Sequence, residues 1–202
     1  MKGLLLKDIY VVMRQAKMFL VILVLFSVIP GLSAVGLIYG AMLPITALAY
    51  DERAKWDTLS SMMPYSKRNI VISKYVLGYI GIAVAGIIAA VANPVVAIFK
   101  NTAVSVDDYV ELAIIVAIAT FVLAVNMPLM FRFGVEKGRI AFLLLNGLAV
   151  AVAMIFGDKI MTALSKVNCG MSTIFIITVL AVIVLNAISM LISVACYKRK
   201  SV

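Results

Sequence analysis

Five stretches of this chain contain no charged residue for 18 residues or more, and this feature constrains its fold most strongly. Four of them have the length expected of single helices: 76–99, 112–131, 140–157 and 167–196. The hydrocarbon core of a bilayer needs ~20 mostly apolar residues per helix, and backbone polar groups inside it must find partners within the protein. These stretches predict membrane-spanning helices and an all-α fold.

The composition agrees with a membrane protein. Hydrophobic residues make up 65% of the chain and charged residues 13%, whereas soluble domains have roughly 45–50% and 25%. The net charge of +9 does not indicate nucleic-acid binding, because the cations lie at the ends of apolar stretches rather than on one face with stacking aromatics. We expect one transmembrane domain over residues 1–202.

The fifth uncharged stretch runs from Met18 to Tyr50 and has Pro30 near its middle. As one helix it would measure about 50 Å, which exceeds a ~30 Å hydrocarbon core. A hairpin near Pro30 gives six spans and leaves only Lys100, Lys159 and Lys166 outside, with fifteen cations inside. Because Lys and Arg accumulate in cytoplasmic loops, this bias favours six spans with both termini cytoplasmic. The predicted spans are 18–31, 33–50, 70–99, 110–131, 140–157 and 170–196.

The first 17 residues predict a helix that lies in the membrane interface. Leu5, Ile9, Val12 and Ala16 would share its apolar face, with cations opposite. A secretory signal is the alternative, but the basic region is long and no clear cleavage site follows it.

The residue types that most catalytic sites require are missing or badly placed. No histidine occurs, which removes Ser-His and Cys-His dyads and the commonest metal ligand. The acidic residues lie in predicted loops or at span ends. The segment GVEKGRI at 134–140 lacks the Gly-Lys-Ser/Thr ending of a phosphate-binding loop. We therefore expect no catalytic residue, metal or cofactor on this chain, and any ATP would be hydrolysed by another chain.

One strongly polar segment, residues 51–74, separates the second and third predicted spans. Its acidic start suits a helix N-terminus and Pro64 would end the helix, so we predict a cytoplasmic helix over 51–66. Trp56, Leu59 and Met63 recur on one of its faces. Such a face fits a docking contact, because aromatic residues and Met are enriched in interface cores. A helix lying on lipid fits the pattern equally well.

The same segment has an acidic start, a tryptophan, a proline stop, a Ser-plus-basic pair and an Ile-Val-x-Ser-Lys-Tyr motif. With MKGLLLKD at 1–8, these features resemble the ABC-type-2 exporter permease family, and most closely its phenol-soluble modulin and antimicrobial peptide exporters. The resemblance rests on Tyr50, Asp51, Glu52, Trp56, Pro64, Ser66, Lys67, Arg68, Ile70, Val71, Ser73, Lys74 and Tyr75.

The resemblance implies that helix 51–66 is a coupling helix seated in a groove of a separate ATP-binding subunit. It assigns that contact to Asp51, Glu52, Trp56, Leu59, Met63, Lys67 and Arg68. It also implies two ATP-binding subunits that hold ATP and Mg²⁺, a second permease copy, amphipathic peptide substrates and the bacterial cytoplasmic membrane.

Polar residues inside the predicted spans are candidates for a translocation path. These are Asn93, Asn126, Asn146 and Asn186, although hydrogen bonding to a neighbouring helix is the more frequent role of such residues. Gly36 and Gly40 form a GxxxG pair, a weak signal for a homodimer.

The expected function is the permease subunit of an ATP-driven exporter. A stand-alone secondary transporter or channel is the alternative, although no acidic residue lies well inside a predicted span and coupling usually relies on ionisable groups at membrane depth. A membrane-embedded enzyme is disfavoured because no pair of nucleophile and base exists.

Overall fold

A computed structural model of the chain describes residues 2–15, 17–29, 32–63, 65–99, 106–144 and 171–200. Within these ranges almost every residue is helical and none lies in a strand, which confirms the predicted all-α class. The helices are α1 (Lys2–Gln15), α2 (Lys17–Val28), α3 (Ser33–Arg53), α4 (Trp56–Ser61), α5 (Lys67–Phe99), α6 (Val106–Phe133) and α8 (Met171–Lys200). Residues 135–144 form a further helical segment.

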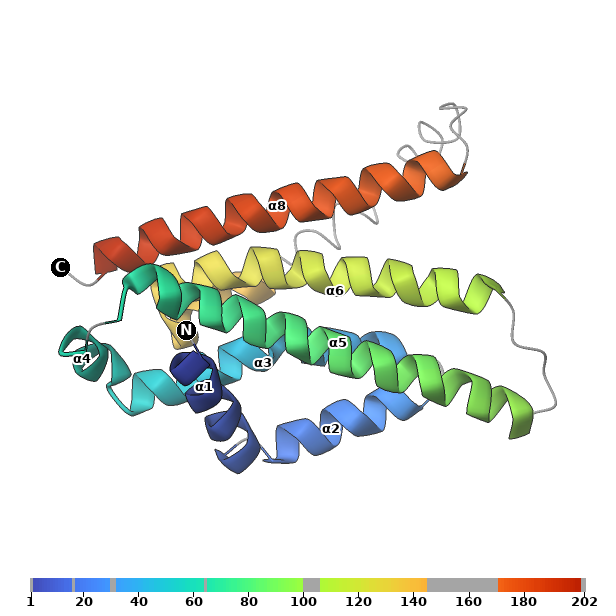
Figure 1. Ribbon diagram of the computed structural model, residues 1–202, viewed down its shortest axis with the longest axis horizontal. Helices are drawn as coiled ribbons and strands as arrows, with labels where there is room; N and C mark the ends of the chain where they lie inside the picture. The colour runs from blue at the N-terminus through green and yellow to red at the C-terminus, as the bar shows by residue number, and fades with distance from the viewer. Residues whose placement is uncertain are drawn as a thin grey trace.

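The long helices α3, α5, α6 and α8 form an elongated bundle, with α2 and α8 on opposite sides (Figure 1). The short helix α4, helix α1 and the C-terminal end of α8 lie toward one end of this bundle (Figure 1). We call it the α4 end. Helix α3 packs most extensively on α5, and α6 on α8. The prediction that both termini and the polar segment lie in the cytoplasm stays a prediction.

Two glycines allow the backbones of α3 and α5 to meet. A Cβ added at Gly81 would lie 2.5 Å from the Gly40 carbonyl oxygen, and one at Gly40 would lie 2.7 Å from the Gly81 oxygen. Pro44 lies inside α3. Because proline lacks an N–H, it cannot donate to the Gly40 carbonyl. That carbonyl lies against the Gly81 backbone, where a Cα–H can serve as a weak donor.

The GxxxG pair contributes to packing within the chain. A Cβ at Gly36 would lie 2.7 Å from the backbone nitrogen of Ser27 in α2, and Gly40 contacts α5. The Tyr39 ring of α3 packs against α2 as well, with centroid distances of 5.0 Å to Phe19 and 6.0 Å to Phe26. These glycines therefore give no support to a contact between two copies.

Four described helices are long and apolar enough to cross a membrane: Ser33–Arg53, Lys67–Val96, Asp108–Phe133 and Val179–Arg199. They correspond to the predicted spans 33–50, 70–99, 110–131 and 170–196. The predicted first span, 18–31, appears as the 12-residue helix α2, whose length of about 18 Å is short for a bilayer.

Neither α1 nor α2 alone is long and apolar enough to cross a membrane. The two together are, but they are bent by 83° relative to each other. The described residues thus contain four candidate spans, or five if this bent pair counts as one. The predicted span 140–157 lies outside the described residues from position 145 onward. Six spans and the interfacial position of residues 1–17 therefore stay predictions.

Candidate functional site

Four charged side chains from three helices meet at the α4 end of the bundle. Lys74 of α5 donates to Asp8 Oδ1 of α1 at 2.7 Å and to Asp51 Oδ2 of α3 at 2.6 Å. Lys7 reaches Asp51 Oδ1 at 2.7 Å and Asp8 Oδ1 at 3.0 Å. Ser73 adds a hydrogen bond to Asp8 Oδ2 at 3.3 Å. We call Lys7, Asp8, Asp51 and Lys74 the charge quartet.

Three side chains of the charge quartet are largely buried, that of Lys7 is 23% exposed, and the formal charges of the four cancel. The side chains of Lys74 and Asp8 are 1% and 2% exposed, and that of Asp51 is 12% exposed. Removing one partner of a buried ion pair leaves an uncompensated charge, which is strongly destabilising. The quartet therefore holds α1, α3 and α5 in one arrangement beside α4.

The helix predicted over 51–66 begins later in the structure. Asp51 and Glu52 belong to the last turn of α3, which ends at Arg53, and α4 covers only Trp56–Ser61. Lys55 separates the two helices with a φ of 50°, in the left-handed region. Asp51 and Glu52 were expected to begin a helix. They lie instead at the C-terminal end of α3, where Asp51 forms its ion pair with Lys74.

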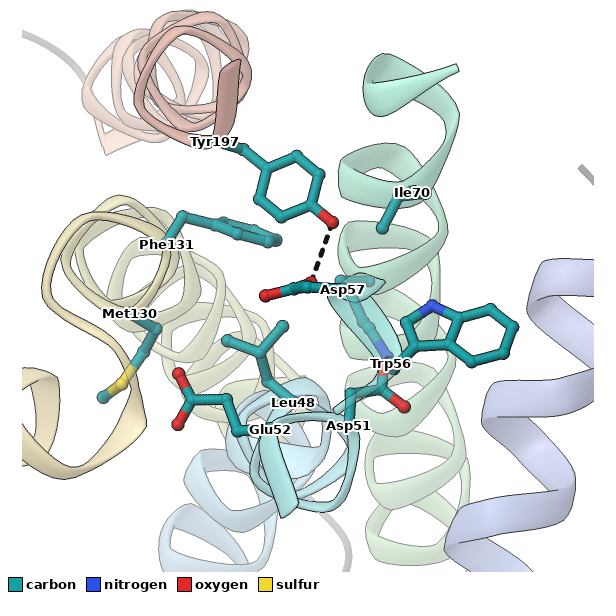
Figure 2. Close-up of a pocket in the computed structure, with 10 residues that line it drawn as sticks. Leu48, Asp51, Glu52, Trp56, Asp57, Ile70, Met130, Phe131 and Tyr197 are labelled. Atoms are coloured by element: carbon teal, nitrogen blue, oxygen red, sulfur yellow. Dashed lines mark hydrogen bonds and ion pairs between the residues drawn. The ribbon is translucent and has the colours of Figure 1, made fainter. Parts of the chain in front are cut away.

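Trp56 faces the inside of the chain. It is half-buried and packs against the hydrophobic core, and the Lys7 ammonium lies 4.1 Å from the centroid of its ring. Trp56 also lines a small cavity with Asp57 and Tyr197 (Figure 2). The volume of this cavity, about 20 Å³, suits a single water. The tryptophan predicted as a partner anchor is thus a contact between α4 and α1.

Three exposed apolar side chains lie on α4 and directly after it, close in sequence to basic residues, and Asp57 and Thr58 of α4 are exposed as well. Leu59 is 48% exposed, Met62 79% and Met63 40%. We call these three residues the α4 cap. Lys55 and Arg68 are exposed nearby in sequence, and Lys67 is half-buried. Of the predicted partner contacts, Glu52, Leu59, Met63 and Arg68 are exposed, Trp56 and Lys67 are half-buried, and Asp51 is buried.

Glu52 connects α3 to the turn after α6. Its carboxylate oxygens each accept from the Val135 N–H at 3.1 Å, and Val135 begins the helical segment 135–144. A carboxylate at a helix N-terminus is favoured by unpaired N–H groups and the helix dipole. Gly134 has a φ of 80°, which glycine adopts without strain, and a Cβ there would lie 2.9 Å from Glu52 Oε1.

The four predicted asparagines lie in different surroundings. Asn186 is buried in α8, accepts from the Tyr79 hydroxyl at 2.9 Å and donates to the Val182 carbonyl at 2.8 Å. Asn93 is half-buried in α5. Asn126 is fully buried, and its side chain has no hydrogen-bond partner among the described residues. Asn146 lies outside the described residues. A path lined by these four residues stays a prediction.

Asn186 belongs to a polar row on α8. Tyr75 of α5 lies 2.6 Å from the Ser189 hydroxyl and 2.9 Å from that of Ser193, and Ser189 donates to the Ala124 carbonyl of α6. At the α4 end, Tyr197 donates to Asp57 Oδ1 at 3.0 Å. We call Asn186, Ser189, Ser193 and Tyr197 the α8 polar row.

In the part of the chain that the structure describes, no three His, Cys, Asp or Glu side chains form a group that could hold a metal. The expectation of no metal or catalytic residue on the whole chain stays a prediction. The arrangement described above instead connects helices mechanically: the charge quartet joins α1, α3 and α5, and Tyr197 joins α8 to α4.

Sequence reasoning named Asp51 as a partner contact but missed Lys7, Asp8, Lys74 and Tyr197 as functional candidates. Five residues of the motifs that carry the family resemblance are buried: Asp8, Asp51, Ser73, Lys74 and Tyr75. An intramembrane or span-end Lys in an apolar motif was the available signal, since such a charge requires a partner.

The sequence model of the family described as ABC-2 family transporter protein matches residues 3–198. No curated protein and no solved structure matches the chain.

Proposed function

Since the chain belongs to the ABC-2 family of transporter proteins, we propose that it is the permease subunit of an exporter whose ATP is hydrolysed by a separate subunit. Membership supports a membrane transport component, and ABC transporters use an ATP-binding partner. The candidate spans agree with a multi-pass membrane protein.

The α4 cap is the observation that carries the proposed contact with the ATP-binding subunit. Met62, the most exposed large apolar residue of the chain's described part, lies directly after α4. Exposed apolar side chains rimmed by polar residues are typical of interaction sites. The cations Lys55 and Arg68 would suit a partner groove with an acidic rim.

The opposite face of α4 supports a coupling role. Trp56 contacts Lys7, which is ion-paired to Asp51, and Asp57 accepts from Tyr197. A force applied to the α4 cap would therefore act on α1, α3 and α8 through side-chain contacts. A helix resting on lipid would not need such connections to three helices.

The remaining parts of the proposal rest on the resemblance. They are two ATP-binding subunits that bind ATP and Mg²⁺, a second copy of this permease, and amphipathic or antimicrobial peptides as substrates, most like those of phenol-soluble modulin exporters. The excess of cations at the α4 end supports a cytoplasmic position for this end in a bacterial membrane.

The test is co-purification of the tagged chain from its native membrane, followed by an assay of ATP hydrolysis. Met62→Glu places a charge in the α4 cap and should prevent recovery of a Walker-containing subunit, whereas Met62→Leu keeps the apolar surface and should retain it. Trp56→Ala is less suitable because Trp56 packs inside the chain.

A chain that purifies without any ATP-binding subunit would contradict the proposal and favour a stand-alone transporter or channel. Equal recovery of the subunit with Met62→Glu and Met62→Leu would contradict the α4 cap as its docking surface, while leaving the exporter assignment in place.

A further inference from the structure

We propose that Tyr197 is a positioning residue that makes the last helix, α8, follow the movements of α4. This inference rests on the proposed function, because it assumes that an ATP-binding subunit moves α4. It adds a route to α8, a helix that is separated from α4 by more than 100 residues of sequence.

The first step of this route is the contact between Tyr197 and Asp57. The Tyr197 hydroxyl donates to Asp57 Oδ1 at 3.0 Å, and Asp57 lies in the first turn of α4. Figure 2 shows Tyr197 descending from α8 toward Asp57. A hydrogen bond to an ionised acceptor is stronger than one between neutral groups.

The second step is the orientation of the Tyr197 ring. Tyr197 is only 7% exposed. Its ring and that of Phe131 in α6 form a T-shaped pair, with a centroid distance of 5.5 Å and an interplanar angle of 69°. This geometry is favourable for aromatic pairs. The packing of the ring against Phe131 therefore fixes the direction of the Tyr197 side chain. A movement of Asp57 would then act on α8 as a whole, because the side chain cannot swing to absorb it.

The third step is the α8 polar row, which transfers the position of Tyr197 along the membrane. Its members recur every three or four residues and so lie on one face of the helix. Ser189 and Ser193 bond to Tyr75 of α5, and Asn186 bonds to Tyr79 one turn further on. These contacts fix the register of α8 against α5, so that a displacement at Tyr197 moves the helix as a unit.

Asp57 is exposed on α4, whereas the row on α8 is buried. The Tyr197–Asp57 bond consequently attaches the exposed helix α4 to the buried polar face of α8. Its removal should leave α8 packed in the bundle but disconnected from α4.

The experiment uses the complex purified from its native membrane, with Cys169→Ser so that Cys196 is the remaining thiol of the chain. Cys196 is half-buried and directly precedes Tyr197. The rate at which a maleimide alkylates Cys196 is measured without nucleotide and with ATP plus vanadate. If α8 follows α4, this rate differs between the two states.

Tyr197→Phe removes only the hydroxyl and should abolish most of the nucleotide-dependent difference, roughly nine-tenths, because one hydrogen bond to a charged group can bias an equilibrium by about tenfold. Asp57→Ala removes the other partner from an exposed position and should cause the same loss. The double variant should lose no more than either single variant, since both changes break one contact. Tyr10→Phe, at an exposed position of α1, is the matched control and should keep the full difference.

A nucleotide-dependent difference that persists in Tyr197→Phe and in Asp57→Ala would overturn the inference, as would additive losses in the double variant. Recovery of the ATP-binding subunit is measured in the same preparations. A wild-type chain that recovers no such subunit refutes the proposed function, whereas a recovered subunit with an unaltered response in both variants refutes only the role of Tyr197.

Discussion

Lys74 and Asp8 form an ion pair of 2.7 Å although 66 residues separate them in the chain. Both side chains are almost completely buried. The pair fastens the N-terminal helix α1 to the start of α5, and Asp51 of α3 completes the contact at 2.6 Å from the same ammonium. Two carboxylates therefore share the buried Lys74 ammonium, and the more exposed Lys7 contacts both of them as well.

We expect Lys74→Met to reduce the free energy of unfolding by about 3–5 kcal/mol, the range for breaking a buried ion pair. The cost arises because Asp8 remains buried and Asp51 remains mostly buried, with only Lys7 to compensate both charges. Unfolding of the purified chain by SDS titration would measure it. Lys17→Met, at an exposed position, is the control and should change stability little. A similar loss in both variants would refute the structural role of the quartet.

The contact between Lys7 and Trp56 can be followed directly, because Trp56 is the only tryptophan of the chain. Lys7→Met removes the ammonium that lies 4.1 Å from the ring centroid and should free α4 from α1. A cation–π contact contributes about 0.5–1 kcal/mol at exposed sites and more when desolvated. We expect faster quenching of Trp56 fluorescence by acrylamide in Lys7→Met. Unchanged quenching would show that Lys7 does not hold α4.

Gly81→Ala should destabilise the chain, and Gly86→Ala in the same helix should not. A Cβ at Gly81 would lie 2.5 Å from the Gly40 carbonyl oxygen, whereas one at Gly86 would lie 3.6 Å from Leu37 Cδ2, an ordinary contact. Overpacking costs about 1–3 kcal/mol. At Gly86 the better helix propensity of alanine should stabilise by up to about 1 kcal/mol. Opposite shifts in the SDS unfolding midpoint would support the close α3–α5 crossing, and equal shifts would contradict it.

The apolar stretches predicted the four long helices α3, α5, α6 and α8, because a membrane span requires continuous apolar length and helical hydrogen bonding. The boundary at Asp51 was predicted wrongly. Local rules favour acidic residues at a helix start, but Asp51 pairs with Lys74, 23 residues away, and this tertiary contact keeps it in α3. The inward position of Trp56 depends on Lys7 in the same way. A charged residue at a span end signals that a partner is needed, but a single sequence does not show which distant residue supplies it.

Pro128 and Ser189 are related through the Ala124 carbonyl, and this relation can be tested by a rescue experiment. Pro128 lies inside α6 and has no N–H, so it cannot donate to the Ala124 carbonyl four residues earlier. The Ser189 hydroxyl of α8 donates to that carbonyl instead. Ser189→Ala should therefore leave a buried acceptor unsatisfied and cost about 1–3 kcal/mol of unfolding free energy.

Restoring the backbone donor should remove most of this cost. In Pro128→Ala the N–H of residue 128 can bond to the Ala124 carbonyl within α6, so Ser189→Ala should be much less harmful in that background. The measurement is a double-mutant cycle by SDS titration, with Ser193→Ala as the matched change one turn further along α8. Ser193 bonds to Tyr75 rather than to Ala124, so Pro128→Ala should not rescue it. Equal costs of Ser189→Ala in the two backgrounds would show that the hydroxyl does not replace the donor that Pro128 lacks.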